Sequence, residues 1–230
     1  MIATERIPEQ HASHIRPLVI AAPRASRRSA VIVLDWFERL LLLGFFGWLV
    51  VRMLAHYLAY RQSANLVLLP SEGLVVVLVL IRRPAGQLSR SAAEWLIALI
   101  VTCSFMLVAP TSQGSLAPAA LGVLLVLMGT VVQIHAKLAL GRSFGCVPAH
   151  RGLMLGGPYR MVRHPMYAGY LLSHLAFLAM NPTWWNAAVY AFCYSLQVPR
   201  LLAEERLLAR DPEYRSYQAS VRYRLVPGVF

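Results

Sequence analysis

Apolar residues fill six long tracts of this chain, and polar residues collect in the gaps between them. The tracts cover approximately residues 34–59, 64–81, 92–109, 116–138, 166–180 and 187–202. Several of them approach the ~20 residues with which an α-helix crosses the hydrocarbon of a bilayer. The pattern therefore predicts an all-α fold, that of a polytopic membrane protein with about five to six transmembrane helices.

Short breaks interrupt the second tract and separate the last two. The sequence PSEG at 70–73 leaves two alternatives, a kinked helix or a helix that begins later. The sequence NPTWWN at 181–186 predicts the turn of a helical hairpin, with Trp184 and Trp185 at the membrane interface. The tract at 166–180 is short for a full crossing. In the first tract, Gly44 and Gly47 predict a face for close helix packing.

Composition agrees with a membrane protein, since 58% of the residues are hydrophobic and only 14% are charged. In soluble domains, about 45–50% of the residues are apolar and about 25% are charged. The formal net charge of +12 comes from 21 arginines and one lysine against ten acidic residues. Such an excess can indicate nucleic-acid binding, but here it lies between the apolar tracts. This distribution is typical of loops that face anionic membrane lipid, so we expect no nucleic-acid partner.

The arginines also predict an orientation. They gather in the N-terminal tail, at 82–90, at 139–165 and after residue 202, whereas the intervening turns carry Arg61 or no charge. Under the positive-inside rule, both termini and the 139–165 loop are cytoplasmic, which requires six crossings.

Three regions follow from this reading. Residues 1–30 form a basic cytoplasmic tail, and 31–138 form the N-terminal transmembrane helices. Residues 139–230 contain a polar loop, the helical hairpin and a cytoplasmic helix with helical spacing through EERLLARDPEYRSY at 204–217. The first apolar run begins near Val31 after a leader without a clear cleavage site, so we interpret it as a retained span.

The three cysteines lie far apart and form no CxxC pair, so neither a disulfide framework nor a metal site is expected. Cys103 and Cys193 lie in apolar tracts, which predicts that they are small packing residues. Cys146 lies in the polar loop.

Residues that can bind a ligand collect in and after this loop. In GPYRMVRHPMYAGY (157–170), Pro165 is placed to begin a helix, which leaves free backbone N–H groups near His164. Glu204 and Glu205 follow the last apolar tract, after 109 positions without an acidic residue. They are either a solvated helix end or acceptors for a cationic or hydroxyl-rich ligand.

Arg200 precedes Glu204 by four residues, so the two side chains share a helical face. Either they form a salt bridge, or Arg200 binds a carboxylate ligand with two parallel hydrogen bonds. A transporter is a rival function class, but transporters carry their polar groups near mid-membrane, and here the polar cluster lies at one face.

The segments LGRSF, GLMLGGPYRMVRHPMYAGY, EERLL and DPEYRSYQASVRYRLVP resemble the isoprenylcysteine carboxyl methyltransferase family and its bacterial relatives, and more distantly the phospholipid methyltransferases. The resemblance covers about residues 139–227. It implies an S-adenosylmethionine-dependent methyltransferase of the bacterial inner membrane, with its cofactor site in the C-terminal half at the cytoplasmic face.

The resemblance also implies roles for particular residues. Arg200 lies where the family binds the carboxylate of the acceptor. The cofactor-binding residues it implies are Arg151, Gly152, Leu153, Met154, Tyr159, His164, Pro165, Met166, Tyr167, Glu204 and Glu205. Their chemistry is suitable, because carboxylates, aromatic faces and backbone donors match a sulfonium, an adenine and ribose hydroxyls. The implied acceptor is lipophilic or lipid-modified. Arg200 favours carboxyl O-methylation of an isoprenylcysteine-like acceptor, and N-methylation of a phospholipid or another amine is the alternative.

Overall fold

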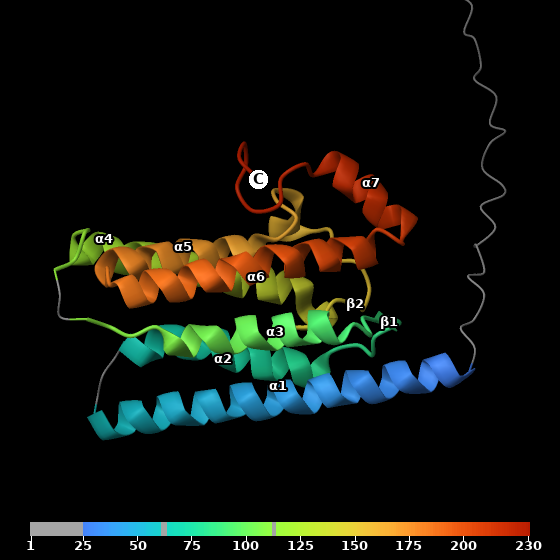
Figure 1. Ribbon diagram of the computed structural model, residues 1–230, viewed down its shortest axis with the longest axis horizontal. Coiled ribbons are helices and arrows are strands. Elements are labelled where there is room, and N and C mark those ends of the chain that lie inside the picture. Colours follow the sequence, from blue (N-terminus) through green and yellow to red (C-terminus); the bar gives the residue numbers. More distant parts are fainter. Residues whose placement is uncertain (1–24, 61–63, 112–113) are drawn as a thin grey trace, which may run out of the picture.

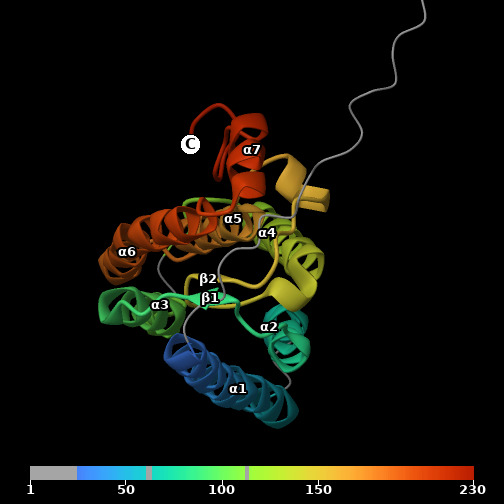
Figure 2. The same cartoon turned by 90° about the vertical axis from the view of Figure 1, so that its right-hand side faces the viewer.

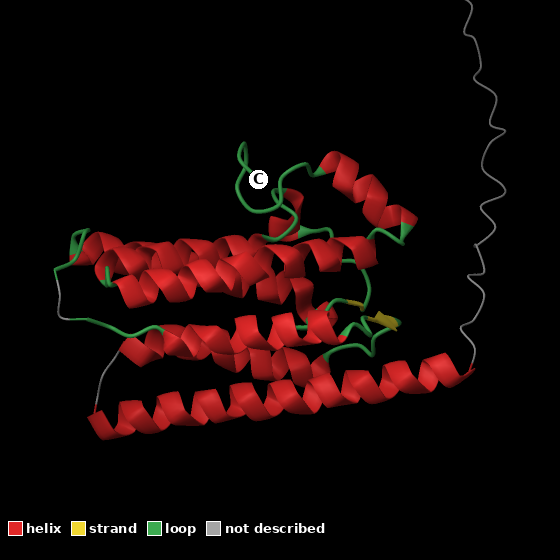
Figure 3. Ribbon diagram, in the orientation of Figure 1, coloured by secondary structure: helices red, strands yellow, loops and turns green. Residues whose placement is uncertain are grey.

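The computed structural model describes residues 25–60, 64–111 and 114–230, so most of the predicted 1–30 tail lies outside the described residues. Seven α-helices follow one another in these segments (Figures 1 and 3): α1 Ala25–Tyr60, α2 Ala64–Ile81, α3 Ala92–Ser104, α4 Ala119–Leu140, α5 Pro165–Met180, α6 Trp184–Leu208 and α7 Pro212–Ser220. Each predicted apolar tract is helical. The helical prediction is therefore confirmed, and α2 continues through Pro70 without a later start.

The long helices lie roughly side by side in layers. Helices α4, α5 and α6 form one layer, and α2 and α3 form a second layer beneath it (Figures 1 and 2). Helix α1 covers the side of the second layer that faces away from α4, α5 and α6. Helix α4 packs on both α5 and α2, and α3 packs on α6. These contacts cross the predicted boundary at 138/139, because α4 joins the N-terminal helices to the C-terminal hairpin.

The closest helix contact joins α4 and α5. A Cβ atom added to Gly169 would lie 2.8 Å from the carbonyl oxygen of Gly129, so only glycine permits this approach. The packing face predicted at Gly44 and Gly47 is wrong, since a Cβ atom at either position would meet nothing within 4 Å. Spacing alone did not show which glycines lie between helices.

The predicted hairpin between α5 and α6 is confirmed. Thr183 caps α6 by accepting a hydrogen bond from the Asn186 N–H, and the Asn186 side chain binds both backbone groups of Ala109. Trp184 and Trp185 are exposed at this turn. The other end of the molecule collects the remaining connections, including the short 3-10 helices η2 (Gly141–Ser143) and η3 (Gly157–Arg160).

Two details at this second end correct the sequence prediction. A small antiparallel sheet pairs β1 (Gln87–Leu88) with β2 (Ala149–His150), so the fold is not purely α. The helix expected over 204–217 is two helices, because Asp211 caps α7 by accepting a hydrogen bond from the Glu213 N–H. Pro212 begins α7 where its missing N–H costs nothing.

The outer surface is strongly apolar. By length and composition, Ser29–Ala59 and Ala119–Ser143 can each cross a membrane, and Leu68–Ile81 and Ala92–Leu107 are shorter apolar helices. Trp36, Phe37 and Trp48 on α1 are exposed, as lipid-facing residues would be. Cys193 is buried as expected, but Cys103 is exposed and is not a packing residue.

Candidate functional site

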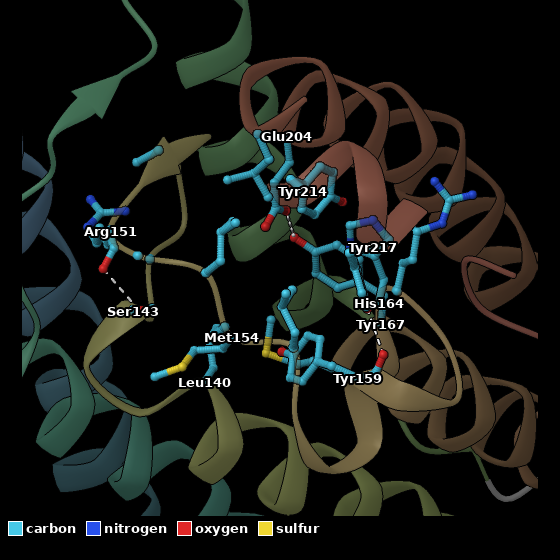
Figure 4. Close-up of a pocket in the computed structure, with 18 of the residues that line it drawn as sticks. Leu140, Ser143, Arg151, Met154, Tyr159, His164, Tyr167, Glu204, Tyr214 and Tyr217 are labelled. Carbon is cyan, nitrogen blue, oxygen red and sulfur yellow. Dashed lines mark hydrogen bonds between the residues drawn. The ribbon is translucent and has the colours of Figure 1, made fainter. Parts of the chain in front are cut away.

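A polar pocket lies at the end of the molecule where the connections gather (Figure 4). Its enclosed volume is about 70 Å³. Its walls come from the end of α4, the 143–155 segment, η3, the beginning of α5, the end of α6, and α7. Its lining includes nine of the residues predicted to bind the cofactor: Arg151, Gly152, Leu153, Met154, Tyr159, His164, Met166, Tyr167 and Glu204. Segments distant in sequence therefore meet as expected.

The loop wall of this pocket depends on glycine. Gly152 and Gly157 have φ angles of 98° and 58°, in the left-handed region that favours glycine. The hydroxyl of Ser143 donates a hydrogen bond of 3.1 Å to the carbonyl oxygen of Arg151. These features shape 151–157 into a turn with backbone close to the pocket.

Aromatic side chains form the opposite wall. The Tyr167 hydroxyl donates to the Glu204 carboxylate over 3.1 Å, and the His164 ring stacks on Tyr167 with centroids 5.5 Å apart. Tyr217 donates to the carbonyl oxygen of Tyr159 over 2.7 Å. Burial raises the pKa of Tyr217 to about 12, so this phenol is a neutral donor near pH 7.

Glu205 faces away from the pocket lining, unlike its neighbour Glu204. Its carboxylate binds the side chains of His164, Arg163 and Arg224 at 3.1, 3.0 and 3.0 Å. Burial alone would raise the pKa of Glu205, but these partners lower it below its usual value. Glu205 therefore holds His164 in place and ties it to the C-terminal segment.

Pro165 also lies outside the lining, as the first residue of α5. Just before it, the N–H groups of Arg163 and His164 donate to the carbonyl oxygens of Tyr223 and Arg224. Because these two bonds fix the chain just before α5, Tyr223 and Arg224 help to position a pocket wall.

Arg151 enters a buried charge cluster that sequence reasoning missed. Its guanidinium binds Asp35 at 2.9 Å and also binds Glu38, both on α1. Arg82, directly after α2, binds the same two carboxylates at 3.2 and 3.1 Å. The cluster contains two acidic and two basic side chains, so its formal charge is balanced.

Glu38 also holds the loop backbone. Its Oε1 atom accepts hydrogen bonds from the N–H groups of Cys146 and Val147 at 2.7 and 2.9 Å. Helix α1 therefore anchors the loop that lines the pocket. The available signal was a pair of acidic residues three positions apart in an apolar tract, in a chain with ten acidic residues.

A second cavity, of about 420 Å³, lies among the helices. Most of its lining is apolar and comes from α1, α5 and α6, with Phe46 and Phe177 among the residues. Phe105, in the 3-10 helix η1 (Phe105–Leu107), also lines it. Arg200 lines this cavity and not the polar pocket. Arg200 therefore lines a different space from Glu204 and the other pocket residues that the resemblance assigns to the cofactor.

Arg200 is buried and only partly paired. It donates to the carbonyl oxygen of Cys146 over 2.8 Å and lies over the Tyr167 ring at 5.6 Å. Among the described residues, its Nε atom is buried without a hydrogen-bond partner. It also contacts the side chains of Gln197 and Cys146, whereas Glu204 pairs with Tyr167. A buried guanidinium with an unused donor is suited to an anionic ligand.

The polar pocket and the apolar cavity share part of their walls. Gly145, Cys146, Met166 and Tyr167 line both. A ligand in one space would therefore lie next to a ligand in the other.

One further polar contact supports this end of the molecule. His150, on β2, lies 3.1 Å from Asp211 at the start of α7, so the small sheet is tied to the last helix. In residues 25–60, 64–111 and 114–230, no group of three or more His, Cys, Asp or Glu side chains could hold a metal ion.

Together these features define a class of protein: an apolar helical protein with a polar pocket at one end that adjoins an apolar cavity between its helices. Residues 117–211 match the family model described as phospholipid methyltransferase. A protein-S-isoprenylcysteine O-methyltransferase A from Arabidopsis thaliana is 34% identical over 56 residues, which cover 22% of this chain and 28% of that protein.

These two findings confirm the predicted resemblance to the isoprenylcysteine and phospholipid methyltransferases. The chain matches little more than a quarter of the length of the Arabidopsis protein. The family match includes α4, α5 and α6, which carry Tyr167, Arg200 and Glu204.

Proposed function

We propose that this protein is an integral membrane methyltransferase that uses S-adenosylmethionine to methylate a carboxylate on a lipophilic, isoprenylcysteine-like acceptor. The observation that carries the proposal is the shared wall between the two spaces. The polar pocket contains nine of the eleven proposed cofactor-binding residues, the apolar cavity contains Arg200, and Tyr167 lines both.

The chemistry of the polar pocket fits this cofactor. Glu204 offers a carboxylate, Tyr159 and Tyr214 offer aromatic rings, and the glycine-rich 151–157 turn offers backbone groups. These are suitable partners for ribose hydroxyls, an adenine and a positively charged sulfur. When bound, S-adenosylmethionine supplies an electrophilic methyl group.

The size of the polar pocket adds one requirement. Ligand pockets typically enclose roughly 300–1,000 Å³, and this one encloses about 70 Å³. A cofactor-sized ligand therefore requires the pocket to widen. The 152–155 segment forms part of the wall and lies in neither a helix nor a strand, so we expect it to move outward.

Arg200 would bind and orient the acceptor. A carboxylate has an unperturbed pKa of about 3.5–4 and is already ionised near pH 7, so its methylation needs no general base. It needs placement in line with the methyl group and removal of water. A buried guanidinium in an apolar cavity provides both conditions.

Amine N-methylation, as on a phospholipid headgroup, is the second candidate. It is favoured by the family model that matches residues 117–211, whose description names phospholipid. An amine must lose a proton to become a nucleophile, so this reaction requires a base. Arg200 cannot serve as that base, because a guanidinium stays protonated.

The cofactor site can be tested by binding measurements. Replacing Glu204 or His164 with alanine should weaken binding of S-adenosylhomocysteine by roughly 1–3 kcal/mol, the cost of a lost hydrogen bond to a charged group. Isothermal titration calorimetry on the purified protein measures this change. Glu213→Ala is the matched control, because Glu213 is exposed on α7 outside the pocket. Unchanged affinity in both variants, with folding intact, would contradict the assignment.

The orientation can be tested separately. We propose six crossings, with both termini, the 139–165 loop and the cofactor site in the cytoplasm of a bacterial inner membrane, because the arginine-rich connections share one face. Single cysteines introduced at Arg142 or Arg160 should resist a membrane-impermeant thiol reagent in intact cells and react after permeabilisation. Labelling in intact cells would overturn this topology.

A further inference from the structure

A polar pair lies deep in the apolar cavity, away from Arg200. The Nδ1 atom of His174, on α5, is 2.9 Å from the hydroxyl of Tyr194, on α6. Both side chains line the cavity. The His174 ring also packs against Phe105 and Tyr190, with centroid distances of 4.4 and 4.9 Å.

Packing alone does not account for this histidine. A phenylalanine would fill the same aromatic cluster without bringing two polar nitrogens among apolar helices, where polar groups are costly. Tyr194 satisfies one nitrogen. Among the described residues, no hydrogen bond is made to the other, Nε2, and it is not a fully buried atom. His174 therefore presents one hydrogen-bonding position to the cavity.

The position of this pair relative to Arg200 follows from helix geometry. Tyr167, which lies under Arg200, precedes His174 by seven residues on α5. Tyr194 precedes Arg200 by six residues on α6. At 1.5 Å per residue, both spacings place the pair about 10 Å farther from the polar pocket than Arg200. A ligand held at Arg200 by its carboxylate would extend past this pair.

We propose that His174 and Tyr194 bind a hydroxyl group on the acceptor, so that the preferred acceptor is an oxygenated lipid carboxylate and not a plain hydrocarbon one. This inference rests on the proposed function, because it takes the cavity as the acceptor site. A hydroxyl both donates and accepts, so it pairs with Nε2 in either tautomer of a neutral imidazole. Because the pair lies about 10 Å from Arg200 along the helices, the acceptor hydroxyl would be in the middle of the lipid chain.

The test compares two probes of equal chain length, a fatty acid with a mid-chain hydroxyl and its unsubstituted parent. With wild-type protein in detergent, calorimetry should show the hydroxylated probe binding about five-fold more tightly, as expected for one net hydrogen bond. His174→Phe should reduce this preference to about one, and Tyr194→Phe should lower it because the imidazole loses the partner that orients it. Tyr194→Phe removes a single oxygen atom, so it keeps the test usable if His174→Phe does not fold.

The control is Tyr223→Phe, the same chemical change on a residue outside the cavity, which should retain the preference. Equal binding of the two probes to wild-type protein would overturn this inference and leave the proposed function standing. A preference that persists in both cavity variants would overturn it as well. If neither probe binds, or if Arg200→Ala binds both as tightly as wild type does, the acceptor site itself is wrong and the proposed function fails with the inference.

Discussion

Replacing Glu38 with alanine is expected to destabilise the protein by about 3–5 kcal/mol, the cost typical of removing one partner from a buried ion pair. The variant would leave Arg82 and Arg151 buried beside a single carboxylate, that of Asp35. It would also remove the acceptor of the Cys146 and Val147 N–H groups. In a protein of this size we expect the apparent Tm to fall by at least about 6 °C.

Thermal unfolding in detergent measures this loss, and two variants sharpen the result. Glu38→Gln keeps an oxygen for the two backbone N–H groups but removes the charge. A loss of Tm between those of wild type and Glu38→Ala would separate the contribution of the ion pairs from that of the hydrogen bonds to the loop. Glu94→Ala is the control, because Glu94 lies 3.9 Å from Arg206, which is 70% exposed. An exposed pair contributes about 0–1 kcal/mol. Equal Tm values for Glu38→Ala and Glu94→Ala would show that the cluster does not anchor the loop.

The helices could be predicted because apolar tracts, prolines and caps are local signals. Pro165 and Thr183 mark the starts of α5 and α6, and Asn181 stands at the turn between them. Helix partners are not local. Gly129 and Gly169 are 40 residues apart, and only the tertiary structure shows that their backbones touch.

The same distinction applies to the site. The pocket residues near His164 and Glu204 came from motifs in the C-terminal half, together with a family resemblance. The contribution of α1 was missed, because Asp35 and Glu38 bind arginines more than 40 residues away in sequence. Glu205 was grouped with Glu204 because they are adjacent, yet successive residues on a helix point in different directions. Only Glu204 lines the pocket.

Replacing Arg200 with alanine should reduce methyl transfer on the order of 100-fold, the cost of losing the group that aligns the reacting oxygen. Affinity for S-adenosylhomocysteine should stay close to that of wild type, because Arg200 does not line the polar pocket. Arg200→Lys keeps the charge but lacks the planar fork that holds both carboxylate oxygens. We expect the rate of methyl transfer in this variant to fall about ten-fold, which corresponds to one lost hydrogen bond to a charged group.

Two readouts on the same protein preparation make this prediction decisive. Calorimetry reports cofactor affinity, and transfer of a radiolabelled methyl group to the acceptor reports turnover. Arg206→Ala, on the same helix but exposed, controls for the loss of a positive charge from α6. If Arg200→Ala abolishes cofactor binding while the protein stays folded, Arg200 belongs to the cofactor site. If turnover is unaffected, no carboxylate is held there, and amine methylation becomes the better account of the cavity. Arg200 also donates a hydrogen bond to the carbonyl oxygen of Cys146, in the wall that the two spaces share. If Arg200→Ala loses turnover and Arg200→Lys does not, Arg200 supports this wall and does not bind the acceptor.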